Sequence, residues 1–106
     1  MFSTSTRKVK HKPSERDVEA RLCARIKAVG GAAYKFTSPA RRGVPDRLVL
    51  MPGDPPLTIF VELKRPGARP TPAQLREHNR LRDLGFRVEV IDSYEGVEVF
   101  IQSLFI

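Results

Sequence analysis

The pattern of apolar positions predicts a helix near the start of the chain. Val18, Leu22 and Ile26 follow one stripe at helical spacing, as in a surface helix with one buried face. Ser14 stands before the stripe as an N-cap, and Asp17 follows it three residues later in the manner of a capping box. The stripe stops at a Gly-Gly pair, which favours a left-handed helix end.

Two further stretches have the features of helices. Thr71-Pro72-Ala73-Gln74 supplies an N-cap, a proline at the first helical position and a glutamine at the third, and this helix should run to Leu84 and stop at Gly85. A last helix at about 94–103 is predicted from apolar residues at i, i+3, i+4, i+7 and i+8, namely Val97, Phe100, Ile101, Leu104 and Phe105.

Four short runs between these helices are typical of strands, at 33–37, 47–51, 57–63 and 86–91. The second and third are separated only by the Pro/Gly-rich residues 52–56, and so short a connection makes an antiparallel hairpin. The predicted order is α-β-β-β-α-β-α. This is an α/β fold with a mixed sheet flanked by helices.

The length of 106 residues fits one domain with a single modest core, and 41% hydrophobic residues is ordinary for a globular protein. Residues 1–12 are basic and without periodicity, so we expect a flexible arm there and one domain at 13–106. No apolar run approaches the ~18–20 residues of a membrane span. The single cysteine, Cys23, excludes an intramolecular disulfide, fits an intracellular setting and is expected to be a small core residue.

The charge balance is 19 basic against 12 acidic residues, a net charge of +7. Such an excess favours a polyanionic partner, with nucleic acid as the default. Membrane surfaces and ribosomal RNA are also compatible with the charge alone.

Three charged residues interrupt the apolar hairpin: Asp46, Glu62 and Lys64. If the turn is centred near Asp54, the numbers of paired residues add up to about 108, which sets Asp46 opposite Glu62 with Cβ atoms ~4.5–5.5 Å apart. Lys64 points to the same face, because strand side chains alternate. Two carboxylates this close repel each other unless a cation or a proton lies between them. Mg²⁺ or Mn²⁺ is the simplest solution, since both prefer hard oxygen ligands.

The alternative is a surface salt-bridge cluster in which Asp46 merely caps a turn. Against it, Glu62 follows three apolar residues inside the most apolar strand, where an unpaired carboxylate is costly. A third carboxylate is offered by the first helix: Glu15 and Glu19 both fall on its apolar side. Glu15 can be explained by the helix dipole, so Glu19 is favoured as an outer metal ligand, with Glu15 next.

Other polar residues give weaker signals. Gln74 is either a helix cap alone or a catalytic residue as well. The two histidines, His11 and His78, have no metal-ligand spacing and are expected to be solvated or at an interface. Basic residues surround the acidic cluster in strands and loops, an arrangement suited to a phosphate backbone. The residues predicted to contact this backbone are Lys35, Arg41, Arg42, Arg47, Arg65 and Arg69.

At these residues the chain resembles the VRR-NUC family of the PD-(D/E)xK nuclease superfamily, over most of 14–104. The motifs that carry the resemblance are Glu19 in the first helix, residues 38–46 (SPARRGVPD), residues 61–64 (VELK), Gln74, and residues 84–86 (LGF). A bare PD…ExK pattern is a weak signal. The extended loop before the aspartate and the downstream Gln and Leu-Gly-Phe make the match more specific.

The resemblance implies Mg²⁺- or Mn²⁺-dependent hydrolysis of DNA phosphodiester bonds. Asp46 and Glu62 would bind the metal directly, with the Leu63 carbonyl as a third ligand and Glu19 acting through the metal shell. Lys64 would orient or help to deprotonate the attacking water, and Gln74 would support the site.

It further implies a homodimeric endonuclease of a bacterium or phage-infected cell, located in the cytoplasm and selective for branched DNA such as four-way (Holliday) junctions. Apolar residues near the C-terminus are candidates for the dimer interface, although core packing explains most of them: Phe100, Leu104, Phe105 and Ile106. The alternatives are a non-catalytic nucleic-acid-binding module and a less selective DNA nuclease.

Overall fold

The element order predicted from the sequence is the order that the structure has. A computed structural model describes residues 12–106. Its elements are α1 (Glu15–Ala28), β1 (Ala32–Lys35), β2 (Arg47–Met51), β3 (Leu57–Leu63), α2 (Pro72–Asp83), β4 (Arg87–Ile91) and α3 (Tyr94–Ser103). The α/β class and the α-β-β-β-α-β-α order are therefore confirmed. Residues 1–11 of the predicted basic arm, with His11, lie outside the described residues.

The helix ends follow their sequence signals. At α1 the Asp17 amide donates to the Ser14 hydroxyl at 3.1 Å and the Ser14 amide donates to the Asp17 carboxylate at 2.9 Å, which completes a capping box. Thr71 and Gln74 make the same reciprocal pair at α2. The chain leaves α1 through Gly30 at a φ of 92°, a left-handed conformation that favours glycine.

The four strands form one mixed sheet in the order β1-β2-β3-β4. β2 pairs antiparallel with both β1 and β3, while β4 pairs parallel with β3 after the crossover through α2. The hairpin register runs from Arg47 opposite Val61 to Met51 opposite Leu57, so paired residue numbers add up to 108 as predicted. The outer strands differ slightly from the predicted ranges, because β1 starts one residue earlier and β4 one residue later.

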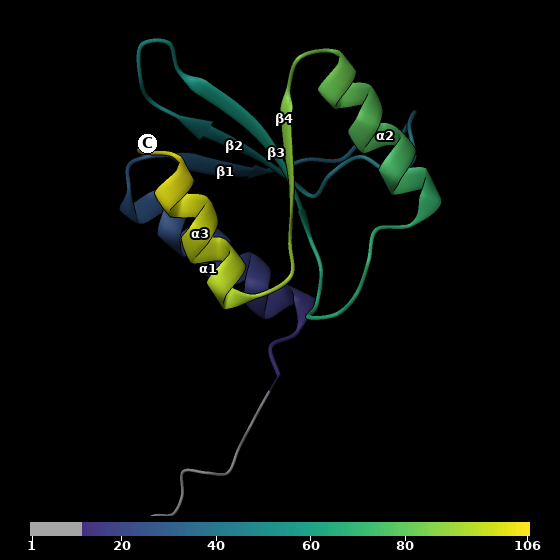
Figure 1. Cartoon of the computed structure of the whole chain (residues 1–106), viewed down its shortest axis with the longest axis horizontal. Coiled ribbons are helices and arrows are strands. Elements are labelled where there is room, and N and C mark those ends of the chain that lie inside the picture. Colours follow the sequence, from purple (N-terminus) through teal and green to yellow (C-terminus); the bar gives the residue numbers. More distant parts are fainter. Residues whose placement is uncertain (1–11) are drawn as a thin grey trace, which may run out of the picture.

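Helices cover both faces of the sheet. Figure 1 shows α1 and α3 together on one side and α2 on the other. The larger core lies between the sheet and the α1/α3 pair and includes Leu22, Val61 and Phe100, all at most 3% exposed. A smaller core lies under α2 and consists of Phe60, Leu81 and Val88, with Phe36 and Leu48 packed against it.

The two cores lie on opposite faces of the sheet, and they determine on which face the polar residues of the hairpin lie. Val61 and Leu63 belong to the larger core, so the alternate residues of β3 face α2. Phe60 packs in the smaller core beside α2, and Glu62 is the next residue on that face. The α2 face is thus apolar at one end of β3 and carries a buried carboxylate at the other.

Candidate functional site

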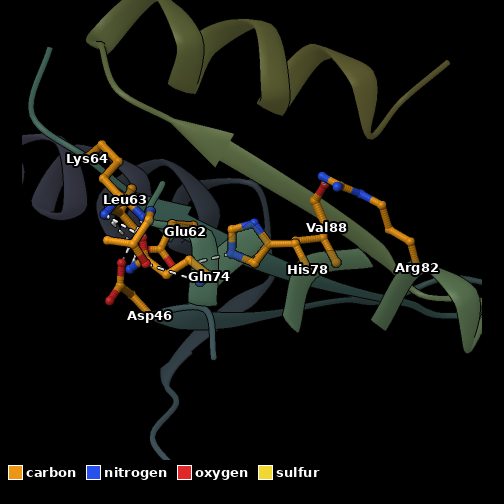
Figure 2. A network of polar contacts seen from close by, with 9 residues as sticks. Asp46, Glu62, Leu63, Lys64, Gln74, His78, Arg82 and Val88 are labelled. Carbon is orange, nitrogen blue, oxygen red and sulfur yellow. Dashed lines mark hydrogen bonds and ion pairs between the residues drawn. The ribbon is translucent and has the colours of Figure 1, made fainter. Parts of the chain in front are cut away.

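Asp46 lies at the point where the chain enters β2. The preceding loop turns at Gly43, whose φ is 80°, and passes through the buried Pro45. Asp46 Oδ2 then accepts a hydrogen bond of 2.8 Å from the Leu63 amide of β3. The Asp46 side chain here replaces the backbone acceptor that would continue the β2–β3 ladder. This bond fixes the Asp46 carboxylate beside the end of β3 (Figure 2).

Glu62 is buried directly next to this carboxylate. It is 2% exposed, although its side chain is charged at neutral pH in an unfolded chain. The Gln74 side-chain amide donates to Glu62 Oε2 at 3.1 Å, and the Lys64 Nζ lies 3.7 Å from the same oxygen. The other oxygen, Oε1, is buried and has no hydrogen-bond partner among the described residues.

Lys64 and Gln74 connect the end of β3 to the first turn of α2. The Lys64 ammonium donates to Gln74 Oε1 at 2.8 Å, and the Thr71 amide donates to the same oxygen at 2.8 Å. Gln74 therefore acts as a helix cap and also contacts both Glu62 and Lys64. The two roles that the sequence left as alternatives are compatible in one side chain (Figure 2).

The electrostatics of the pair follow from burial and proximity. The pKa of Glu62 is raised from 4.5 to about 8, first by burial and then by the charge of Asp46 and its hydrogen bond to Glu62. Lys64 opposes this shift, while Glu15 adds to it. Without a cation, Glu62 is consequently protonated at neutral pH. The like-charge repulsion expected from the sequence is present.

His78 is a residue whose place the sequence reasoning missed. It was expected to be solvated or at an interface, yet it is 0% exposed, and its Nε2 lies 3.5 Å from Glu62 Oε1. Burial lowers the pKa of His78, so the ring is neutral and this contact is not an ion pair. Neither ring nitrogen has a hydrogen-bond partner among the described residues. The missed signal was the helical spacing of Gln74, His78 and Leu81, which puts all three on the face toward the sheet.

The first helix carries Glu19, the residue favoured as an outer metal ligand. Glu19, the favoured third carboxylate, accepts a hydrogen bond of 2.8 Å from Arg47 Nε. Arg47 also donates to the Ala33 carbonyl at 3.0 Å, and it alternates with Asp46, so it lies on the α1 face of the sheet. Both Glu19 and Arg47 are therefore engaged with each other rather than in contact with Asp46 or Glu62. Glu15 is the carboxylate of α1 that acts on the pKa of Glu62.

The other predicted basic contacts fall into two groups. Arg41 is ion-paired with Glu77, with Nη2 at 2.9 Å from Oε1. The second group is exposed and has no acidic partner among the described residues: Lys35, Arg42, Arg65 and Arg69. Cys23, expected in the core, is half-buried on α1, where burial raises the pKa of its thiol.

The donor set at the Asp46–Glu62 pair fits a hard divalent cation. Two carboxylates lie side by side, and Glu62 Oε1 is a buried oxygen that makes no hydrogen bond with the described residues. Within residues 12–106 no group of three or more His, Cys, Asp or Glu side chains is arranged to hold a metal. Mg²⁺ does not need one, because it commonly binds through one or two carboxylates together with water and substrate phosphates.

Comparison with known proteins assigns this arrangement to a family. The model of the VRR-NUC domain matches residues 6–95. The chain belongs to the VRR-NUC family. VRR-NUC domains are part of the PD-(D/E)xK nuclease superfamily, so the resemblance inferred from Asp46, Glu62 and Lys64 is confirmed.

Two VRR-NUC relatives extend the comparison. A protein of Acyrthosiphon pisum secondary endosymbiont phage 1 with the name "Putative nuclease p44" is 54% identical over 81 residues, which cover 76% of this chain and 85% of the phage protein. A solved structure named "VRR_NUC domain" superimposes with a TM-score of 0.78 at 36% identity, over 86% of this chain and 97% of that one. No helix within residues 12–106 is long and apolar enough to cross a membrane.

The raised pKa of Glu62 predicts a pH-dependent stability. The folded protein keeps the Glu62 proton between pH 4.5 and about 8 while the unfolded chain loses it. This contribution to the free energy of unfolding is therefore complete below pH 4.5 and is lost as the pH rises through about 8. Glu62→Gln removes this titration. With chelator present, its gain in the free energy of unfolding over the wild type should therefore be about 1–3 kcal/mol larger at pH 8.5 than at pH 5. Urea denaturation at both pH values measures the difference, and equal differences would show that Glu62 titrates normally.

His78 should be replaceable without loss of stability. A buried ring with two unbound nitrogens costs free energy, and an apolar residue of similar size removes that cost. His78→Leu should leave the free energy of unfolding unchanged or raise it by up to about 2 kcal/mol. Leu81→Ala, on the same face of α2, should lose about 2–4 kcal/mol and shows that the assay detects damage. A comparable loss in His78→Leu would mean that the ring is bonded in the folded protein.

Proposed function

We propose that this protein is a Mg²⁺- or Mn²⁺-dependent endonuclease that hydrolyses phosphodiester bonds in DNA. The observation that carries the proposal is the buried Glu62 carboxylate held beside Asp46, with Lys64 on the same face and one Glu62 oxygen unpartnered. A pure binding module has no use for paired carboxylates facing a phosphate backbone. Membership of the VRR-NUC family and the name of the phage relative support the same activity.

The residues of the site have two proposed roles: some bind the cation, and others stabilise charge on the reacting groups. Oxygens of Asp46 and Glu62 would hold the metal. The Leu63 carbonyl is proposed as a third ligand, because the C=O and N–H of a strand residue point to the same neighbouring strand and the Leu63 N–H points to Asp46. A bound divalent cation supplies charge stabilisation at the phosphate and lowers the pKa of a water nucleophile.

Lys64 and Gln74 act on the reacting groups rather than on the metal alone. The Lys64 ammonium, fixed by Gln74 Oε1 at 2.8 Å, would orient the attacking water and offset negative charge on the phosphate. Gln74 keeps Glu62 Oε2 in place at the same time. Glu19 and Glu15 both stay candidates for the outer metal ligand from α1: Glu19 accepts a hydrogen bond from Arg47, and Glu15 makes the smallest of the contributions to the raised pKa of Glu62.

The finer part of the proposal concerns the DNA. The family resemblance favours branched DNA such as four-way junctions, cut by a homodimer in which a two-fold axis relates two active sites. Phe100 and Leu104 pack in the core, so of the candidate interface residues only Phe105 and Ile106 are exposed, at 63% and 106%. Both residues follow the end of α3, and Val99 is an exposed apolar residue within that helix.

Loss of a carboxylate should abolish cleavage. Asp46→Asn should lower the rate on a labelled four-way junction with Mg²⁺ by about 1,000-fold, since several kcal/mol of transition-state stabilisation corresponds to that factor. Lys64→Ala tests the second role in the same assay. Asp54→Asn, in the exposed β2–β3 turn, is the matched control and should cleave like the wild type.

Each outcome of this assay separates the alternatives. Cleavage that persists in Asp46→Asn contradicts the metal-ligand assignment. Tight binding without cleavage by the wild type favours the non-catalytic module. A linear duplex of the same sequence tests substrate shape, and equal rates on both substrates would indicate a less selective nuclease.

The apolar end of α3 should govern self-association. Replacing both Phe105 and Ile106 by Asp should convert a dimer to a monomer in light scattering, because the charges would have to be buried in the interface. Leu84→Asp changes an equally exposed apolar residue at the end of α2 and should leave the mass unchanged. A monomeric wild type, or a dimeric double variant, would contradict this interface.

A further inference from the structure

A groove of about 410 Å³ lies between α2 and the loop that leads to Asp46. We call it the α2 groove. Its lining is basic and contains a single acidic residue: Arg41, Arg42, Ala73, Arg76, Glu77 and Arg80. It is distinct from the carboxylate pair, since neither Asp46 nor Glu62 lines it.

The wall of the groove is fixed by one buried carboxylate. Glu77 is 5% exposed and accepts a hydrogen bond of 3.0 Å from Arg41 Nε, with Arg41 Nη2 at 2.9 Å. Arg80 Nε lies 3.7 Å from the same oxygen. Removing Glu77 from water is therefore compensated by two arginines, and the ion pair ties the loop to the helix.

Glycine allows this close approach. A Cβ at Gly43 would lie 2.6 Å from the Ala73 carbonyl oxygen, and the φ of 80° at Gly43 also disfavours other residues. The backbone of the loop thus packs directly on the first turn of α2. The groove is a built feature of this contact and does not depend on flexible surface side chains alone.

The two remaining arginines are available to a ligand. Arg42 and Arg76 are exposed, and neither side chain has a hydrogen bond or an ion pair with the described residues 12–106. Four arginines and one glutamate leave the lining with a net charge of +3. Clustered positive charge in a concave surface attracts polyanions.

The groove is also close to the proposed reaction site along the chain. Asp46 follows Arg42 by four residues, and four residues span at most about 14 Å. One strand of duplex DNA rises about 3.4 Å per nucleotide, so this distance corresponds to about four nucleotides. On the other wall, Ala73 directly precedes Gln74, which contacts Glu62.

We propose that the α2 groove binds backbone phosphates of the substrate within about four nucleotides of the bond that is cut. Arg42 and Arg76 contact the phosphates, while Arg41, Glu77 and Arg80 keep the groove in shape. The inference rests on the proposed nuclease function and adds Arg76 to the residues that bind DNA. Contacts of this kind fix the position of DNA and do not read its sequence.

Binding in chelator tests the groove without relying on cleavage. Arg42→Gln and Arg76→Gln, singly and together, are compared by fluorescence anisotropy on a labelled four-way junction over a series of NaCl concentrations. Each lost phosphate contact should reduce the slope of log K against log [NaCl] by about 0.9, or about 1.8 for the double variant. If the contact contributes nothing at 1 M, this is about fivefold weaker binding per arginine at 0.15 M NaCl.

Lys27→Gln is the control for net charge. Lys27 is exposed on α1, which covers the opposite face of the sheet, and its replacement should leave slope and affinity unchanged. An unchanged slope in the double variant, with a native circular dichroism spectrum, overturns the groove. An equal effect of Lys27→Gln also overturns it, because net charge would then explain the binding.

Neutral phosphate analogues locate the contact. Single methylphosphonate linkages placed along the strand should weaken binding by the wild type at a few adjacent positions, and should have no further effect on the double variant. Additive losses at every position would contradict direct contact. Because no step needs cleavage, these results stand apart from the outcome for Asp46→Asn.

Discussion

The structure depends on the forced proximity of two carboxylates. The β2–β3 register and the hydrogen bond from the Leu63 amide fix Asp46, and the parallel pairing of β3 with β4 keeps Glu62 inside the sheet under α2. Burial beside a like charge raises the pKa of Glu62 to about 8. A fold selected only for stability would place an apolar residue at this position, since the other residues of β3 around it are apolar. The unfavourable pair is therefore the feature on which the proposal of a bound cation rests.

The compensation for this pair comes from the first turn of α2. Gln74 caps its helix through Thr71, donates to Glu62 and accepts from Lys64. The same backbone position thus begins the helix and orients two residues of the site. Helix formation and site geometry are coupled here, because a change of one register step at Thr71 would move the side-chain amide away from both partners.

The sequence was sufficient for the architecture and for the placement of Asp46 opposite Glu62. Cap signals at Ser14 and Thr71, and the short turn between β2 and β3, depend on local chemistry, so they could be read directly. The sum rule for the hairpin placed Asp46 opposite Glu62 because an antiparallel register has no freedom once the turn is known. Contacts that depend on how one helix packs on the sheet were harder to predict.

Glu19 and Arg47 illustrate that limit. Both have the residue types of a catalytic site, yet they pair across the α1 face of the sheet. Strand alternation from Asp46 would have placed Arg47 on that face, but its partner could be known only from the packing of α1. His78 was missed for a similar reason: a histidine among charged neighbours resembles a surface residue until the face of α2 toward the sheet is known.

The polar residues on the buried face of α2 also suggest why site and groove should work as one unit. Gln74 and Glu77 are three positions apart, about 4.5 Å along a helix axis. Gln74 contacts Glu62 and Lys64, while Glu77 binds Arg41 of the loop that runs on to Asp46. A rigid helix therefore connects the proposed phosphate contacts to both strands of the carboxylate pair. Phosphates that bind Arg42 and Arg76 would be positioned relative to Asp46 and Glu62 by the same element that holds those carboxylates in place.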